Sequence, residues 1–291
     1  MQLDRALAPA LAPLFVFLWS TGFIGAKLGL PHVEALTFLS LRYAFVVMLL
    51  LAAVSLFRAP WPRDWRSVMH IAVAGVLMQA VYLGGVFVAI GQGLSAALTA
   101  LIVGLQPILT ALFAGMLLGE RVTRAQWAGL ALGFVGVALV VLHSRTPGLP
   151  SVWQASAMWP AVLALVGITA GTLYQKRFCP SFDLRSGGVI QFAASLLVTL
   201  PLAFATETMQ VDWAPELVFA LAWLVLMLSL GAISLLNLLI RRGTAVNVTR
   251  LFYLTPPTTA VIAWLVFGET LQALAWLGMA VAAFGVWLSR R

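Results

Sequence analysis

Long apolar runs constrain this chain more than any other feature of its sequence. Each run is about twenty residues long, which is enough for a helix rising about 1.5 Å per residue to cross the bilayer core. The composition agrees, because 62% of the 291 residues are hydrophobic and only 9% are charged, against about 25% in ordinary soluble domains. A membrane β-barrel would need shorter segments of alternating polarity. The sequence therefore predicts an all-α integral membrane protein.

Charges and Pro or Gly breaks divide the apolar sequence into ten candidate transmembrane helices. They cover residues 11–30, 34–57, 66–90, 94–118, 124–142, 157–178, 184–205, 216–240, 245–267 and 271–288. The connections are short, and the longest polar one, residues 143–155, lies near the middle of the chain. Little of the chain is then left to form a domain outside the membrane.

The basic residues predict the orientation of these ten segments. Thirteen of the 17 Lys and Arg residues fall on the side of the N-terminus, while Lys27 and Arg145 fall on the other side and Arg42 and Arg250 lie within segments. Because Lys and Arg accumulate in cytoplasmic loops, we expect both termini in the cytoplasm. The net charge of +8 then reflects topology and does not indicate nucleic-acid binding.

The chain also repeats itself. LQPILTALFAGMLLGE at residues 105–120 aligns with LTPPTTAVIAWLVFGE at residues 254–269, an offset of 149. The same offset pairs less common residues elsewhere, namely Gly22 with Gly171, Lys27 with Lys176, and Trp127 with Trp276. Five segments per repeat is an odd number, so the second copy enters the membrane from the opposite side. The sequence predicts a 5+5 inverted repeat, a plan common in secondary transporters.

Short motifs in the first repeat point to a family. In order they are Trp19-Ser20-x-x-Phe23, Lys27, Pro31, Arg42-Tyr43, Ser95-Ala96-Ala97, Pro107, Gly119-Glu120, Trp127-x-Gly129 and Gly136. This pattern resembles the ten-helix EamA-type exporters of the drug/metabolite transporter superfamily, with residues 1–145 and 146–291 as the two repeats. Leu18-Trp19-Ser20-Thr21 and the chain length are similar to YddG-like exporters of aromatic amino acids. The resemblance implies a bacterial inner-membrane protein whose central cavity is lined by helices 1, 3, 4, 6, 8 and 9.

Polar and aromatic residues inside the apolar segments are the candidate substrate-binding residues, because such groups usually face a cavity or a partner. They are Trp19, Gln79, Tyr82, Thr99, Gln106, Tyr174, Trp223, Asn237 and Tyr253. Together their rings and amides suit an amino acid with an aromatic side chain, which stacks on the rings while its polar end binds the amides. For each residue alone, an ordinary interhelical hydrogen bond is the alternative.

Four residues are candidate hinges. Pro107 and Pro256 fall in the middle of predicted helices, where proline removes a backbone hydrogen bond, and Gly22 and Gly171 are equivalent positions in the two repeats. A static kink is the alternative for the prolines. Lys27, near the outer end of its helix, either guards the exit and attracts a carboxylate or extends to the membrane interface.

Other residues suggest structural roles. The small residues Gly129, Gly133 and Gly136, with their twins Gly278, Ala282 and Gly285, predict that the fifth and tenth helices dock closely. Arg42 and Arg250 are expected to anchor to backbone carbonyls or to a loop acid such as Glu34. Glu120 and Glu269 are expected to cap the helix that follows each of them.

The function that these features favour is export of small metabolites, above all aromatic or related amino acids, by alternating access in a monomer. Drug-like, sugar-derived or nucleotide-derived solutes remain alternatives, and a non-transporting receptor or scaffold is less favoured. No HExxH motif, His-rich box or phosphate loop is present, so we expect neither an enzyme nor a bound metal or cofactor. All nine acids lie at segment ends or in loops, which favours gradient-driven transport over proton coupling.

Overall fold

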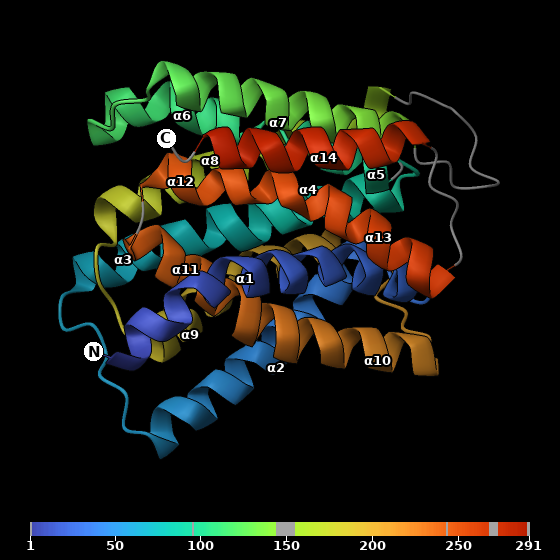
Figure 1. The fold of residues 1–291 in the computed structure, drawn as a ribbon. Coiled ribbons are helices and arrows are strands. Elements are labelled where there is room, and N and C mark those ends of the chain that lie inside the picture. The colour runs from blue at the N-terminus through green and yellow to red at the C-terminus, as the bar shows by residue number, and fades with distance from the viewer. Residues whose placement is uncertain (1, 95, 144–154, 243, 268–272, 290–291) are drawn as a thin grey trace.

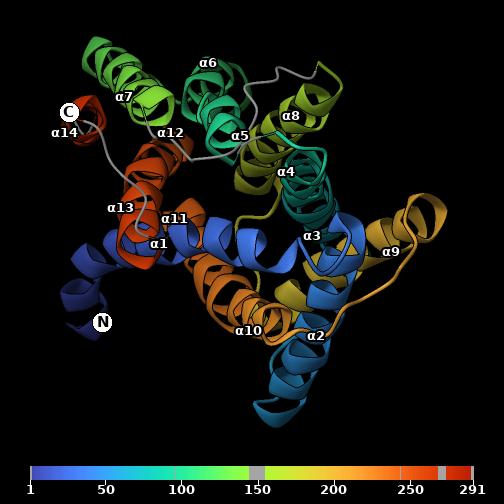
Figure 2. The same cartoon turned by 90° about the vertical axis from the view of Figure 1, so that its right-hand side faces the viewer.

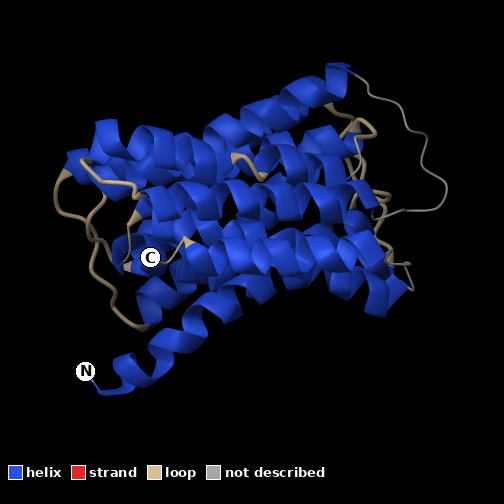
Figure 3. Ribbon diagram, turned by 45° about the horizontal axis from the view of Figure 1, so that its top comes forward, coloured by secondary structure: helices blue, strands red, loops and turns tan. Residues whose placement is uncertain are grey.

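The computed structural model describes residues 2–94, 96–143, 155–242, 244–267 and 273–289. Helices account for nearly all of this part of the chain, and loops gather at the two ends of the bundle (Figure 3). The described residues form no β-strand, although Val33 and Val211 make an isolated antiparallel bridge between two loops. The predicted all-α class is therefore confirmed.

The helices of the first half are α1 (Gln2–Gly29), α2 (Ala35–Leu56), α3 (Trp65–Gly75), the π-helix η1 (Val76–Val81), α4 (Tyr82–Gly91), α5 (Ala96–Val103), α6 (Gln106–Leu118) and α7 (Arg124–His143). Those of the second half are α8 (Ala155–Phe178), α9 (Leu184–Thr206), α10 (Pro215–Trp223), the π-helix η2 (Leu224–Ala232), α11 (Ile233–Arg242), α12 (Ala245–Thr249), the 3-10 helix η3 (Arg250–Leu254), α13 (Thr255–Phe267) and α14 (Ala273–Leu288).

Seven segments in the described part are long and apolar enough to cross a membrane. They are Leu11–Gly29, Ala35–Leu56, Trp65–Gly91, Thr99–Leu118, Met158–Phe178, Leu184–Thr206 and Pro215–Arg242. Two predicted segments appear as the shorter apolar helices Arg124–Val140 and Ala273–Leu288. The segment predicted at 245–267 is interrupted, because α12, η3 and α13 follow one another with different backbone geometry.

The predicted position of the two prolines inside helices is wrong. Pro107 and Pro256 each occupy the second residue of a new helix, because α6 begins after a turn at residues 104–105 and α13 begins where the 3-10 helix η3 ends. Proline is tolerated in a first helical turn because its missing N–H would have no intrahelical partner there. The breaks before α6 and within 250–254 fall at equivalent positions of the 149-residue offset.

Two wide turns that the sequence did not reveal interrupt other long helices. The π-helix η1 joins α3 to α4, and η2 joins α10 to α11. Residue 76, where η1 starts, aligns with residue 225 inside η2. Turns of this kind within α-helices frequently mark functional sites.

The helices α7 and α14 pack against each other along their small residues, as predicted. A Cβ atom added to Gly136 would lie 2.6 Å from the carbonyl oxygen of Gly278, and one added to Gly285 would lie 2.6 Å from that of Gly129. Neither distance leaves room for a side chain. The α7–α14 pair lies on one side of the bundle and the α2–α9 pair on the other, with α1 between them (Figure 2).

Carboxylates from one half of the chain cap helices of the other half. Glu207 accepts hydrogen bonds from the backbone N–H groups of Leu36 and Thr37, each at 2.7 Å, at the start of α2. In return, Glu34 accepts from the backbone N–H and the hydroxyl of Thr208 at 2.7 and 2.6 Å. The hydrogen bond from the Thr208 hydroxyl lowers the pKa of Glu34 below its ordinary value.

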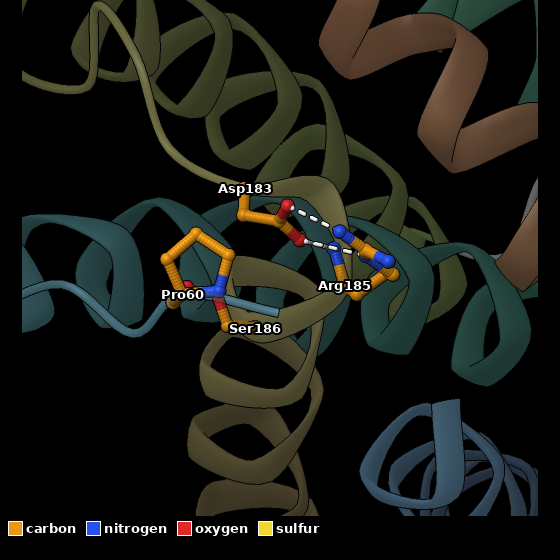
Figure 4. A network of polar contacts seen from close by, with 4 residues as sticks. All are labelled: Pro60, Asp183, Arg185 and Ser186. Atoms are coloured by element: carbon orange, nitrogen blue, oxygen red, sulfur yellow. Dashed lines mark hydrogen bonds and ion pairs between the residues drawn. The ribbon is translucent and has the colours of Figure 1, made fainter. Parts of the chain in front are cut away.

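At the opposite end of the same helix pair, the loop before α3 contacts the start of α9. The Ser186 hydroxyl donates to the Pro60 carbonyl oxygen at 2.7 Å, while Asp183 and Arg185 form an ion pair at 2.9 Å (Figure 4). Hydrogen bonds thus connect the two helices, or the loops next to them, near both ends of the α2–α9 interface.

The expected role of Glu120 is wrong. Gly119 ends α6 with a φ of 68°, a left-handed conformation that suits glycine. Glu120 then accepts from the backbone N–H of Ala245 at 2.9 Å and so caps the distant α12. The following helix α7 does not need Glu120, because Thr123 and Gln126 form a reciprocal capping box in front of it. Glu269 lies outside the described residues.

The α5–α6 and α12–α13 segments run in opposite directions (Figure 1). In Figure 1 the chain passes from α5 on the right to α6 on the left, whereas it passes from α12 on the left to α13 on the right. The helix α1 begins and α14 ends at the same end of the bundle (Figure 1).

Candidate solute-binding cavity

A partly open cavity lies where helices of both halves meet. Its lining comes from α1, α2 and α4 of the first half and from η2 and α11 of the second. The lining residues are Trp19, Gly22, Phe23, Ala26, Arg42, Tyr82, Leu83, Val86, Phe87, Leu228 and Ile233. The cavity measures about 30 Å³, enough for about one or two water molecules. An aromatic amino acid needs the surrounding helices to move before it fits.

Stacked aromatic rings form one wall of this cavity. The rings of Trp19 and Tyr82 lie 7° from parallel with their centroids 6.3 Å apart. Phe252 meets the Trp19 ring edge-on at 5.2 Å, and Phe15, one helical turn before Trp19, packs against it at 5.2 Å. Offset-stacked and edge-to-face arrangements are the favourable geometries for aromatic rings. Tyr82 directly follows η1, so this wide turn sets the direction in which α4 presents its first ring.

Arg42 contributes a positive charge to the same cavity. Its side chain is buried, with 1% of the residue exposed, and Nε donates to the Ser229 hydroxyl oxygen at 2.9 Å. The expected anchoring to Glu34 or to a backbone carbonyl is therefore wrong. Arg42 lies eight residues after Glu34, about 12 Å farther along the helix axis, and Glu34 is engaged by Thr208. Arg250 does follow the expectation, because it donates to the Ser289 carbonyl oxygen at 2.6 Å.

Two candidate glutamines are buried with one polar atom unsatisfied. The Oε1 atoms of Gln79 and Gln106 have no hydrogen-bond partner among the described residues. Gln106 donates through Nε2 to the Thr172 hydroxyl of α8 at 3.3 Å. A buried acceptor without a partner is costly, so each oxygen would gain from a hydrogen bond to a water molecule or a polar group, although neither residue lines the cavity beside Trp19.

Asn237 instead belongs to a closed ring of three amides. It accepts from Gln175 Nε2 at 3.0 Å and donates to Gln191 Oε1 at 3.3 Å, and Gln191 donates to Gln175 Oε1 at 3.0 Å. The ring joins α8, α9 and α11. Each amide finds both its partners in the other two, which fits an interhelical tie. Sequence analysis missed Gln191. Its link to the other two amides depends on how α8, α9 and α11 pack, and the sequence indicates only which face of each helix carries an amide.

The aromatic candidates of the second half lie apart from the Trp19–Tyr82 pair. The Tyr174 hydroxyl hydrogen-bonds to His70 Nδ1 at 2.7 Å. Trp223 donates through Nε1 to the Thr21 hydroxyl at 2.9 Å. Tyr253 packs on Gly133 of α7, and its buried hydroxyl has no partner among the described residues. None of these three rings belongs to the lining of the Trp19 cavity.

The remaining candidates divide between the cavity, the interior and the surface. Gly22 lines the cavity and lies against Leu228 of η2. Its repeat partner Gly171 packs equally tightly, because an added Cβ would lie 2.5 Å from Met78 Cγ in η1. Thr99 is fully buried on α5, and Lys27 is exposed near the end of α1. The two glycines therefore occupy the points where α1 and α8 cross the π-helices of the opposite halves.

The helical bundle and its interior cavity define a polytopic membrane protein with a place for a small solute. Comparison with known families identifies it further. The sequence pattern of the EamA-like transporter family matches residues 7–142 and again residues 155–291. The chain belongs to this family and is a membrane transporter, which confirms the resemblance to EamA-type exporters.

Individual relatives cover nearly the whole chain. An inner membrane transporter of Escherichia coli K12, YedA, described as uncharacterized, is 26% identical over 97% of this chain and 90% of its own length. A protein of Streptantibioticus cattleyicolor described as a "probable terminal-alkyne amino-acid exporter" is 25% identical over 100% of this chain and 95% of its own. One solved crystal structure matches with a TM-score of 0.76 at 18% identity, covering 97% of this chain and 98% of the other. That likeness concerns the fold alone.

Proposed function

We propose that this transporter exports amino acids, aromatic or related, from the cytoplasm across the inner membrane by alternating access. The observation that carries the proposal is the cavity between the two halves, where the stacked rings of Trp19 and Tyr82 offer an aromatic side chain a matching surface. The relative described as an amino-acid exporter supports this solute class. The narrower likeness to YddG-like exporters stays a prediction.

The proposed architecture is ten segments in two inverted repeats, residues 1–145 and 146–291. Three observations support it. The family pattern matches the chain twice, once in each half. The α5–α6 and α12–α13 segments run in opposite directions (Figure 1). The π-helices and the breaks before the prolines recur at the same repeat positions. In this arrangement both termini lie in the cytoplasm, and the chain functions as a monomer.

Alternating access needs places where long helices bend. A turn at residues 104–105 precedes α6, and the 3-10 helix η3 connects α12 to α13, so we assign Pro107 and Pro256 as hinges. Gly22 and Gly171 are the proposed pivots, because their missing side chains let Leu228 of η2 pack directly on α1 and Met78 of η1 pack directly on α8. In this proposal the cavity, which is too small for an amino acid, widens when the helices move toward the inward-open or the outward-open form. Lys27 is the proposed outer charge that attracts a carboxylate.

Counterflow in proteoliposomes tests the transport proposal. Liposomes with the purified chain are loaded with unlabelled phenylalanine or tryptophan, and uptake of the labelled amino acid is compared with protein-free liposomes. We expect accumulation that does not require a pH gradient, because the energy comes from the solute gradient. A flux that appears only with an imposed pH gradient would replace gradient-driven transport by proton coupling. No exchange of any amino acid in a panel would remove the proposed solute class.

A further inference from the structure

We propose that Arg42 is a substrate-binding residue that pairs with a carboxylate of the solute. The site would then select carboxylates with an apolar or aromatic body and would not require an ammonium group. This inference rests on the proposed function and names the chemical class that the same cavity prefers.

The first argument is the missing countercharge. Arg42 lies within the Ala35–Leu56 segment, and only 1% of the residue is exposed. A charge at such a position normally has a partner. The structure gives it a neutral one, the Ser229 hydroxyl. In the part of the chain that the structure describes, no carboxylate forms an ion pair with it. A buried cation without an anion is the arrangement that a bound anion would complete.

The acids that would otherwise neutralise Arg42 have their own partners. Within the described residues, Glu34 binds Thr208, Glu207 caps α2, and Glu120 caps α12. Asp183 pairs with Arg185 and Asp212 with His32. These partners hold the carboxylates at helix ends and in loops, away from the middle of α2.

The second argument is the set of hydrogen-bond donors that Ser229 does not use. A guanidinium carries five N–H donors in a planar fork that matches a carboxylate with two parallel hydrogen bonds. One donor, on Nε, is used by Ser229, whose own hydroxyl hydrogen is directed to the Leu224 carbonyl oxygen at 3.1 Å. Arg42 therefore borders the cavity with its orientation fixed through Nε, and the two terminal nitrogens are the groups that would receive a carboxylate.

The third argument is the shared lining. Arg42, Trp19 and Tyr82 border one cavity, so a carboxylate held by Arg42 places the organic body of the same molecule beside the stacked rings. No acidic residue is among the lining residues of this cavity. An ammonium group would find only the weaker attraction of aromatic faces. The site should accept an anion and a zwitterion but disfavour a cation of the same shape.

Arg42 also connects solute binding to the second half of the chain. Its partner Ser229 lies within η2, and Leu228 of η2 both lines the cavity and contacts Gly22 of α1. A carboxylate that pulls on the guanidinium would act on this wide turn directly. This gives the binding step a route to the proposed pivot at Gly22.

A series of three solutes with one body tests the inference. Phenylpyruvate is an anion, phenylalanine a zwitterion and phenethylamine a cation at neutral pH. For the wild-type chain in proteoliposomes, we expect phenylpyruvate and phenylalanine to compete for counterflow and phenethylamine to compete at least about tenfold more weakly, a difference of about 1.4 kcal/mol. In Arg42→Gln we expect this discrimination to disappear, and in Arg42→Lys to be partly retained.

The controls separate recognition from folding. Arg185→Gln removes an arginine that does not line the cavity and should keep the preference for carboxylates. Binding of the three solutes can also be measured on the detergent-solubilised wild type, as the rise in its thermal midpoint with each solute. This gives the order of the three affinities even if Arg42→Gln does not fold. Equal competition by all three solutes in the wild type, or unchanged discrimination in Arg42→Gln, would overturn the role of Arg42 while leaving the transport proposal in place. If no solute is exchanged at all, both the role of Arg42 and the transport proposal are contradicted.

Discussion

Single side chains illustrate how the surroundings decide what a polar or aromatic residue does inside this bundle. Trp19 and Trp223 both lie within apolar segments and were equally plausible candidates from the sequence. In the structure, Trp19 stacks on Tyr82 beside the cavity, whereas Trp223 satisfies its N–H on the Thr21 hydroxyl. The two tryptophans therefore form a matched pair for separating substrate contact from packing.

We predict that Trp19→Ala lowers the rate of amino-acid exchange about tenfold or more, equivalent to 1.4 kcal/mol, because the solute loses its stacking surface. Trp223→Ala should reduce exchange much less. Rates are measured by counterflow and divided by the amount of folded protein, since removing a buried aromatic side chain also destabilises a protein by about 3–5 kcal/mol. Equal losses in the two variants would argue that Trp19 serves packing alone.

Sequence analysis grouped the candidate residues by type, and this was only partly sufficient to predict the site. Gln79 and Tyr82 are three residues apart, yet η1 ends between them, so the assumption of a regular helical face does not apply there. Asn237 is held by Gln175 and Gln191, a pairing that depends on three helices at once. The sequence suggested only an anchoring role for Arg42. That no described acid pairs with this residue is visible only in the tertiary structure.

At the scale of elements, the positions of the long helices could be predicted and their interruptions could not. Hydrophobic runs determine where a chain crosses a membrane, and the predicted segments at 34–57 and 184–205 agree within one residue with α2 and α9. The predicted prolines marked the right places but the wrong geometry, because a proline at the start of a helix and one in its interior look alike in sequence. The π-helices leave no compositional trace.

The packing of α7 on α14 provides a prediction at this scale. In Gly136→Ala the new methyl group would meet the α14 backbone at Gly278 and Ala282, and overpacking of this kind costs about 1–3 kcal/mol. Gly115→Ala on the exposed side of α6 is the control, since its Cβ meets nothing closer than 3.5 Å. Both changes gain the same helix propensity, about 1 kcal/mol. We expect a lower thermal midpoint in detergent only for Gly136→Ala; equal midpoints would contradict close docking.

At the scale of the whole molecule, the repeat in the sequence and the arrangement of the helices point to one design. The repeat offset was visible because Pro, Gly-Glu and Trp recur at 149 residues. The contacts between halves could not be predicted in the same way, since the capping of α12 by Glu120 and of α2 by Glu207 joins residues that are far apart in the sequence. These cross-links connect the halves at their ends, while the cavity and the π-helices lie between.

The measurement that tests this design most directly is the sidedness of equivalent loops. Cys179, the one cysteine of the chain, is first replaced in Cys179→Ser, and then Arg121→Cys and Thr270→Cys are made separately at equivalent repeat positions. A membrane-impermeant maleimide is applied to intact cells and to inverted membrane vesicles. An inverted repeat predicts labelling of Thr270→Cys only in intact cells and of Arg121→Cys only in inverted vesicles. Labelling of both positions from the same side would contradict two oppositely oriented halves and the alternating-access mechanism built on them.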